Sequence, residues 1–243
     1  MPWSVAFLFE YLSSELEGEG RVQPIRPIVD DLGLAFRADA KAEGQLVRVG
    51  GWECIGGAVP REARWFAVEL TRSSAPWAFS KGEPFRTIAS LELFATLLCV
   101  VLFGGSWPTG AAGTVRLQGL TDNLGNTFAL TRLMSSKFPL VVILAERAAQ
   151  LQSRSMALNL EWAPRDQNEE ADALTNCDFS LFDPRKRVVV DLEEIRWLVL
   201  PRMLVVASGI YGAVQERKAG RASAAPEEPR PRTKAKLRQR EPW

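Results

Sequence analysis

The order of apolar segments between residues 34 and 176 constrains the fold more than any other feature of this sequence. Three strand-like stretches come first, separated by glycines and prolines, and a long segment with apolar residues at helical spacing follows. Two strand–helix units complete the pattern. We predict strands at 34–38, 46–55, 64–71, 115–120 and 157–162, and helices at 86–103, 139–153 and 169–176. This β-β-β-α-β-α-β-α order predicts an α/β domain.

The segments outside this region are shorter and differ in composition. We predict an amphipathic helix at residues 3–12, a strand at 187–191 and a helix at 192–200. Residues 215–243 are rich in Ala, Pro, Glu, Lys and Arg, and this composition predicts disorder. We therefore divide the chain into an N-terminal helix and linker (1–31), a central domain (32–178), a C-terminal extension packed on it (179–214) and a disordered basic tail (215–243).

The sequence of 243 residues contains no histidine, and this excludes several classes of enzyme. Ser-His and Cys-His nucleophile pairs, histidine-ligated zinc and histidine-ligated haem all need an imidazole. Any chemistry in this chain must therefore use carboxylates, Lys, Arg, Ser, Thr or Tyr.

The cysteines and the apolar runs indicate where in the cell the protein is located. Cys54, Cys99 and Cys177 are far apart and show no metal-binding spacing, which predicts a reducing, intracellular location, cytoplasmic or nuclear. The first residues lack the basic segment of a signal peptide. The longest apolar run, residues 93–105, is shorter than the ~20 residues of a membrane span, so we predict a buried helix and no membrane.

The charge of the chain is unevenly distributed. Residues 215–243 contain nine basic and four acidic residues, a net charge of +5, so the remaining 1–214 carry −4 within the total of +1. The basic tail could hold a phosphate backbone or act as a nuclear address, and it could equally be a solvated terminus without a specific role.

Four carboxylates occur at positions that favour a shared site. Asp39 follows the first predicted strand, Glu92 interrupts the apolar helix, Asp122 follows the fourth strand and Asp172 lies on the last helix. A carboxylate on an apolar helix face needs a cation, and acids at the ends of neighbouring strands can meet at one edge of a sheet. Such oxygen ligands suit Mg²⁺ or Mn²⁺, and two ions ~4 Å apart support phosphodiester hydrolysis. Taken singly, each acid also has an ordinary explanation as a helix cap, a turn residue, an ion pair or a solvated side chain.

The ordered set of motifs around these acids resembles the type 1 ribonuclease H domain, and more narrowly the one carried by retroelement reverse transcriptases. The resemblance covers about residues 32–178. The matching motifs are Asp39-Ala40 with Gly50-Gly51-Trp52, Ser90-Leu91-Glu92-Leu93, Thr121-Asp122-Asn123, and Trp162-Ala163-Pro164 followed by Asn168-Glu169-Glu170-Ala171-Asp172.

The resemblance implies a ribonuclease H-like fold with a mixed five-stranded sheet, three strands antiparallel and two parallel, flanked by helices. It implies that Asp39, Glu92, Asp122 and Asp172 bind two Mg²⁺ or Mn²⁺ ions and cleave the RNA strand of an RNA–DNA hybrid. Nucleic-acid contacts are expected at Asn123, Arg165 and Asn168. A polymerase domain of a parent polyprotein is the further partner it suggests.

The chain departs from the family pattern in one functional respect. Many members carry a histidine in the loop before the last aspartate, and here that loop is Ala163-Pro164-Arg165-Asp166-Gln167. Two hypotheses therefore remain open besides a coincidental α/β fold. The first is an active metal-dependent endonuclease, and the second is an inert ribonuclease H-like module with a structural or nucleic-acid-binding role.

Overall fold

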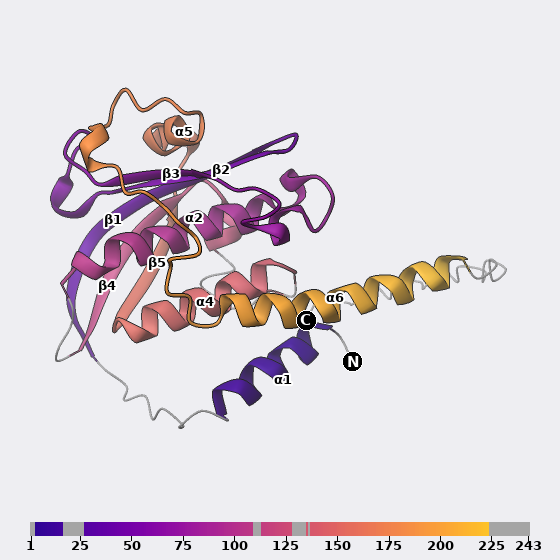
Figure 1. The fold of residues 1–243 in the computed structure, drawn as a ribbon. Coiled ribbons are helices and arrows are strands. Elements are labelled where there is room, and N and C mark those ends of the chain that lie inside the picture. Colours follow the sequence, from indigo (N-terminus) through magenta and orange to yellow (C-terminus); the bar gives the residue numbers. More distant parts are fainter. Residues whose placement is uncertain (1–2, 17–26, 109–112, 128–134, 136, 224–243) are drawn as a thin grey trace, which may run out of the picture.

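A mixed five-stranded sheet forms the centre of the computed structural model, which describes residues 3–16, 27–108, 113–127, 135 and 137–223 (Figure 1). The strands are β1 (Ile28–Glu43), β2 (Leu46–Glu53), β3 (Trp65–Glu69), β4 (Thr114–Thr121) and β5 (Met156–Trp162). The α-helices are α1 (Trp3–Leu16), α2 (Ile88–Phe103), α4 (Leu140–Ser153), α5 (Glu169–Thr175) and α6 (Leu200–Ser223). Residues 124–127 are also helical. The predicted order of strands and helices in the central region is confirmed.

The sheet has the strand order β3-β2-β1-β4-β5. β1 pairs antiparallel with β2, and β2 pairs antiparallel with β3, whereas β1–β4 and β4–β5 are parallel. This is the mixed sheet that the sequence resemblance implied. The parallel pairs are joined through helices, as parallel neighbours require.

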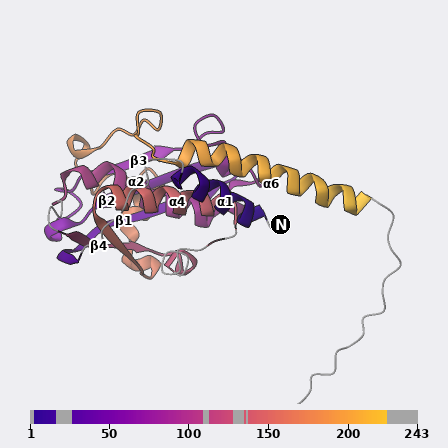
Figure 2. The same ribbon diagram turned by 90° about the horizontal axis from the view of Figure 1, so that it is seen from below.

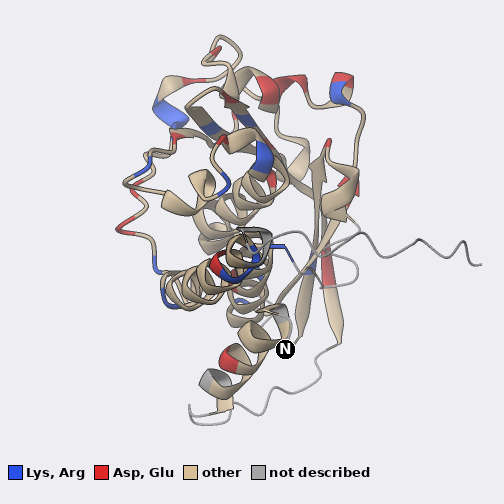
Figure 3. Ribbon diagram, turned by 90° about the vertical axis from the view of Figure 1, so that its right-hand side faces the viewer, with Lys and Arg blue, Asp and Glu red and all other residues tan. Residues whose placement is uncertain are grey.

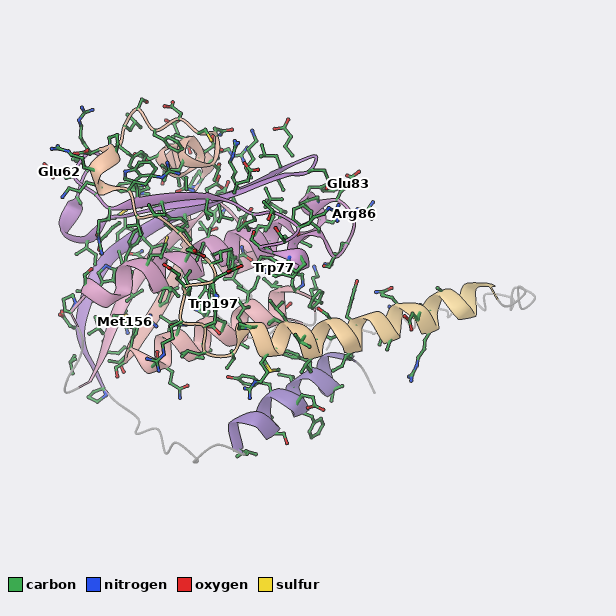
Figure 4. The ribbon with its side chains drawn as sticks, viewed as in Figure 1. Glu62, Trp77, Glu83, Arg86, Met156 and Trp197 are labelled. Atoms are coloured by element: carbon green, nitrogen blue, oxygen red, sulfur yellow. The ribbon has the colours of Figure 1, made fainter. Side chains whose placement is uncertain are left out.

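The helices lie in layers on both faces of the sheet. α5 covers one face, and α2 and α4 cover the other, with α6 and α1 packed outside α4 (Figures 1 and 2). α2 is buried along most of its length because the sheet lies on one side of it and α4 on the other. Phe94 of α2 also contacts the rings of Trp77 and Trp197, two loop residues labelled in Figure 4.

α2 is the one segment of the described residues whose length and composition would allow a membrane span. With its flanking turns it covers Pro84–Ser106, and 67% of its apolar window is buried inside the protein. Burial between a sheet and a second helix is the usual situation of a core helix.

Gly50 and Gly51 lie in the interior of β2. A Cβ on Gly50 would lie 2.9 Å from the Leu174 Cβ of α5, and one on Gly51 would lie 2.5 Å from Cys99 Sγ of α2. The missing side chains therefore let helices approach β2 closely from both faces.

We expect Gly51→Ala to lower the free energy of unfolding by about 1–3 kcal/mol, because the added methyl group overfills a closed space. Besides Cys99, it would lie 3.1 Å from the backbone oxygen of Arg37. Urea denaturation measures this loss. Gly105→Ala is the control, since a Cβ there meets nothing within 4 Å, and an equal effect of both substitutions would contradict the packing explanation.

The C-terminal extension differs from its prediction. Residues 188–199 form neither the expected strand nor the expected helix, and a single bridge joins Arg187 to Trp65. The helix starts only at Leu200 and runs to Ser223, so 215–223 are helical and not disordered. Residues 224–243 lie outside the described residues. Pro201 does not interrupt this helix, because proline fits the first turn, where its missing N–H has no helical partner.

Glu146 of α4 fixes the start of α6. Its carboxylate is fully buried and accepts hydrogen bonds from the backbone N–H groups of Leu198, Val199 and Leu200 at 2.7–3.2 Å. Gln150 bonds the same carboxylate. A side chain of one helix therefore supplies the acceptors that the first turn of another helix lacks.

We expect Glu146→Ala to destabilise the protein by about 3 kcal/mol, because three backbone donors at the start of α6 lose a buried charged acceptor. Amide hydrogen exchange at residues 198–200 should accelerate by more than that in β1. The exposed Glu194→Ala is the control. Unchanged exchange at 198–200 in the Glu146 variant would show that α6 is held by other contacts.

Candidate active site

The parallel pairing of β1 and β4 brings Asp39 and Asp122 to the same region of the sheet. Arg37 pairs with Leu120, so Asp39 and Asp122 each lie two residues further along neighbouring strands. Asp122 follows β4, as predicted. Asp39 lies within the 16-residue β1 and not at its end, because the strand continues beyond it in the hairpin with β2.

The alternation of side chains along β1 decides which face Asp39 occupies. Phe36 lies on the α2 side, where its ring stacks on that of Trp107. Arg37 and Asp39 have the opposite orientation: Arg37 donates to Gln167 O, and Asp39 Oδ2 accepts a 2.8 Å hydrogen bond from Thr175 Oγ1 of α5. Asp39 is therefore a buried carboxylate, 3% exposed, beneath α5.

Glu92 reaches the site from the other helical layer. It lies in the second turn of α2, is 8% exposed and accepts a 3.3 Å hydrogen bond from Asn126 Nδ2. Glu83 and Arg86, labelled in Figure 4, mark the end of the molecule where α2 begins. Glu92 lies towards this end of α2, and the charge of Asp122 acts on it.

Asp172 completes the group from α5, and its side chain is 41% exposed. Arg165 lies between it and Asp122: Arg165 Nε is 3.5 Å from Asp122 Oδ2, and Nη2 is 4.0 Å from Asp172 Oδ1. The side chain of Asp122 is 17% exposed. Two of the acids are thus buried and two lie closer to solvent.

The buried acids respond electrostatically to the other two. Burial raises the pKa of Asp39 to about 6, with further increases from the charges of Asp122 and Asp172, while the hydrogen bond from Thr175 opposes the shift. Burial raises the pKa of Glu92 to about 8, and the charges of Asp122 and Asp39 add to it. Asp122 therefore lies close enough to repel both buried acids, and Asp172 lies close enough to repel Asp39.

The donor chemistry fits hard divalent cations, although the side chains are not yet arranged around one. Within the described residues, no three Asp, Glu or Cys side chains are positioned to hold a metal ion together. Thr175, Asn126 and Arg165 instead satisfy the separate carboxylates. Mg²⁺ and Mn²⁺ prefer oxygen donors, and carboxylates that repel one another when no cation is present are donors of this kind.

The three residues predicted to contact nucleic acid differ in their surroundings. Asn123 is half-buried, and its Oδ1 accepts a hydrogen bond from Asn126 N, at the start of the helical residues 124–127. Asn168 is buried, and its Nδ2 donates to Ala38 O. Its side chain makes no capping hydrogen bond to α5, because the amide is turned towards β1. Arg165, with a side chain 76% exposed, is the one of the three that solvent reaches freely.

Trp162 is a site residue that our sequence reasoning did not single out for function. Its Nε1 donates a 3.0 Å hydrogen bond to the backbone oxygen of Asp122, and half of the residue is exposed. An exposed indole beside the acids can stack on a base or a sugar. The Trp-x-Pro motif after β5 was the available signal.

Comparisons with known proteins find no family by sequence and only weak likenesses to solved structures. No family model and no curated protein matches the chain. Among solved structures, RNase H1 of the archaeon Halobacterium salinarum is 19% identical and covers 62% of this chain and 98% of its own, with a TM-score of 0.37. An N-terminal RNase H domain from Mycobacterium tuberculosis is 18% identical and covers 62% and 94%, with a TM-score of 0.38.

The observed sheet and its flanking helices decide the fold class. This chain has a ribonuclease H-like fold. Neither structural likeness is close enough to assign an activity, so the function has to be argued from the four acids and their surroundings.

Proposed function

We propose that this chain is a metal-dependent endonuclease that cleaves the RNA strand of RNA–DNA hybrids. The convergence of Asp39, Glu92, Asp122 and Asp172 from β1, α2, the end of β4 and α5 is the observation that supports this best. Proteins avoid burying neighbouring carboxylates, so the buried pair Asp39 and Glu92, with the charge of Asp122 acting on both, favours a site for cations.

Each acid would have a distinct part in such a site. Asp39 and Glu92, the buried pair, would hold the inner side of the metal shell, and Asp122 and Asp172 the side facing solvent. Two divalent ions, when bound, would supply a Lewis acid and an activated water for in-line attack on a phosphodiester. The hydrogen bonds from Thr175 to Asp39 and from Asn126 to Glu92 would keep these two side chains oriented.

The substrate would reach the exposed side of the group. Trp162 and Arg165 lie there and offer an aromatic face and a positive charge to a sugar-phosphate backbone. Both basic and acidic residues occur along the ribbon at the end of the molecule that holds α5 (Figure 3). We therefore expect weak, shape-dependent binding of the hybrid, strongly reduced by salt.

A strand-specific cleavage assay tests this function. The purified chain would be incubated with a hybrid labelled separately on each strand, in Mg²⁺, Mn²⁺ or EDTA, beside double-stranded DNA and double-stranded RNA. Cutting of the RNA strand of the hybrid alone, in the presence of metal, is the expected result. A folded protein that cuts nothing in either metal would overturn the proposal.

That negative result would favour the second candidate, an inert ribonuclease H-like module that binds nucleic acid or supports a larger protein. The absence of a ready three-carboxylate ligand set in the described residues favours it. Origin in a retroelement reverse transcriptase, a polymerase partner and an intracellular location stay predictions for either candidate.

A further inference from the structure

Arg165 occupies an unusual place among the acids. It begins the short turn Arg165–Gln167 between β5 and α5 and contacts carboxylates of two different elements, Asp122 after β4 and Asp172 on α5. The two contacts, at 3.5 and 4.0 Å, are long for charge-assisted hydrogen bonds. One guanidinium thus spans the gap between two of the four acids without binding either tightly.

The other cations nearby have different partners. Arg37 donates to Gln167 O and lies 3.5 Å from Glu170. Lys41 bonds Asn176 Oδ1 and lies 3.1 Å from Glu43. Among the ion pairs of the described residues, Arg165 is therefore the cation that meets Asp122 and Asp172.

We propose that Arg165 is a built-in counter-cation, which neutralises Asp122 and Asp172 until a divalent ion displaces it. This inference rests on the proposed function, because it assigns the same acids to the metal. A divalent ion carries twice the charge and draws several carboxylate oxygens to itself at ~2 Å, which a guanidinium at these distances does not do. Arg165 can leave without disturbing the core, since its side chain is 76% exposed.

Displacement of Arg165 from the two acids would also allow it to bind substrate. Once released from the two acids, its planar group would lie at the exposed side of the site, free to bond a phosphate oxygen with two parallel N–H groups. The same residue would then limit metal binding in the free protein and assist substrate binding in the loaded one.

The affinity for Mn²⁺ in the absence of nucleic acid tests this inference directly. Free Mn²⁺ would be measured by electron paramagnetic resonance during titration of the full chain and its variants. Removing the competing charge in Arg165→Gln should tighten binding about two- to fivefold, the range expected for exposed ion pairs. Arg165→Lys, which keeps the charge, should stay closer to the wild type.

Arg185→Gln is the matched control, because Arg185 is 89% exposed and pairs with Asp183 outside the site. It should bind Mn²⁺ like the wild type. Equal or weaker binding by Arg165→Gln than by the wild type would overturn the counter-cation role.

Hybrid cleavage by the same samples separates this inference from the proposed function. If Arg165→Gln binds Mn²⁺ like the wild type and both cut the hybrid, the counter-cation role fails and the nuclease stands. If Arg165→Gln binds more tightly but no variant cuts, the counter-cation role stands and the nuclease fails. If no variant binds Mn²⁺ and none cuts, both are overturned; if none binds Mn²⁺ but the hybrid is cut, only the counter-cation role fails.

Discussion

Asp122→Asn should abolish cleavage of the RNA–DNA hybrid, with a loss of about 10³-fold or more in rate. Asp122 is the acid that connects the group: its charge acts on both buried carboxylates, Asp39 and Glu92, and it contacts Arg165. Asparagine keeps the shape and one oxygen but removes the negative charge that a metal needs. Single-turnover cleavage in Mg²⁺ measures the effect.

Asp166→Asn is the control for this substitution. Asp166 is an exposed acid in the turn beside Arg165, so its removal changes the net charge of the chain by the same amount near the same site. We expect cleavage within about threefold of the wild type for an exposed group outside the metal shell. If Asp122→Asn retains near wild-type cleavage while Asp166→Asn does not, the assignment of the acids is wrong.

Glu92→Gln should stabilise the protein at alkaline pH, by on the order of 3 kcal/mol at pH 9. The pKa of Glu92 rises from 4.5 to about 8 in the folded protein, chiefly through burial and next through the charge of Asp122. Folding therefore favours the protonated acid, and the cost of its ionisation grows as pH rises from 4.5 to about 8. Glutamine removes this cost and keeps an acceptor for Asn126.

The pH profile distinguishes this effect from better packing. The difference in unfolding free energy between Glu92→Gln and the wild type should shrink towards zero near pH 5, where the wild-type acid is protonated in the fold. Chemical denaturation at pH 5, 7 and 9 without divalent ions measures it, with the exposed Glu194→Gln as the control. A difference that does not change between pH 5 and 9 would contradict repulsion and burial as its cause.

The gain in stability expected of Glu92→Gln and the loss of activity expected of Asp122→Asn have the same origin. Four carboxylates placed together oppose folding when no cation is present, and a bound divalent ion reverses that cost. Mg²⁺ should therefore stabilise the wild type at pH 8 more than it stabilises Glu92→Gln. This is the trade of stability for function expected at a working site.

The sheet could be predicted from the sequence because its strands and α2 carry clear apolar patterns. The four acids are predicted as one site because their motifs resemble one family in the right order, and their shared role stays a prediction. The position of Asp39 within β1 could not be predicted, since it depends on the hairpin that pairs residues 40–43 with β2, and pairing is a tertiary effect. Pairing with β4 extends the strand at its other end, over residues 28–33.

The C-terminal extension was harder to predict for two physical reasons. Its helix begins only at Leu200, because the buried Glu146, fifty residues away in sequence, binds the preceding N–H groups. Its continuation to Ser223 follows from the high helix propensity of Ala, Glu, Lys and Arg, which the charge-rich composition of 215–223 conceals. The bridging role of Arg165 has no sequence signal, since it depends on the distance between two elements.

The central claim is that Asp39, Glu92, Asp122 and Asp172 together hold divalent metal ions. Anomalous diffraction at the manganese edge, from crystals of the full chain grown with Mn²⁺ and a short RNA–DNA hybrid, tests it most directly. We predict two anomalous peaks ~4 Å apart, bound by carboxylate oxygens of these four residues and by one phosphate of the RNA strand. A map from the same crystals with the hybrid bound and no manganese in contact with Asp39 or Asp122 would contradict the account.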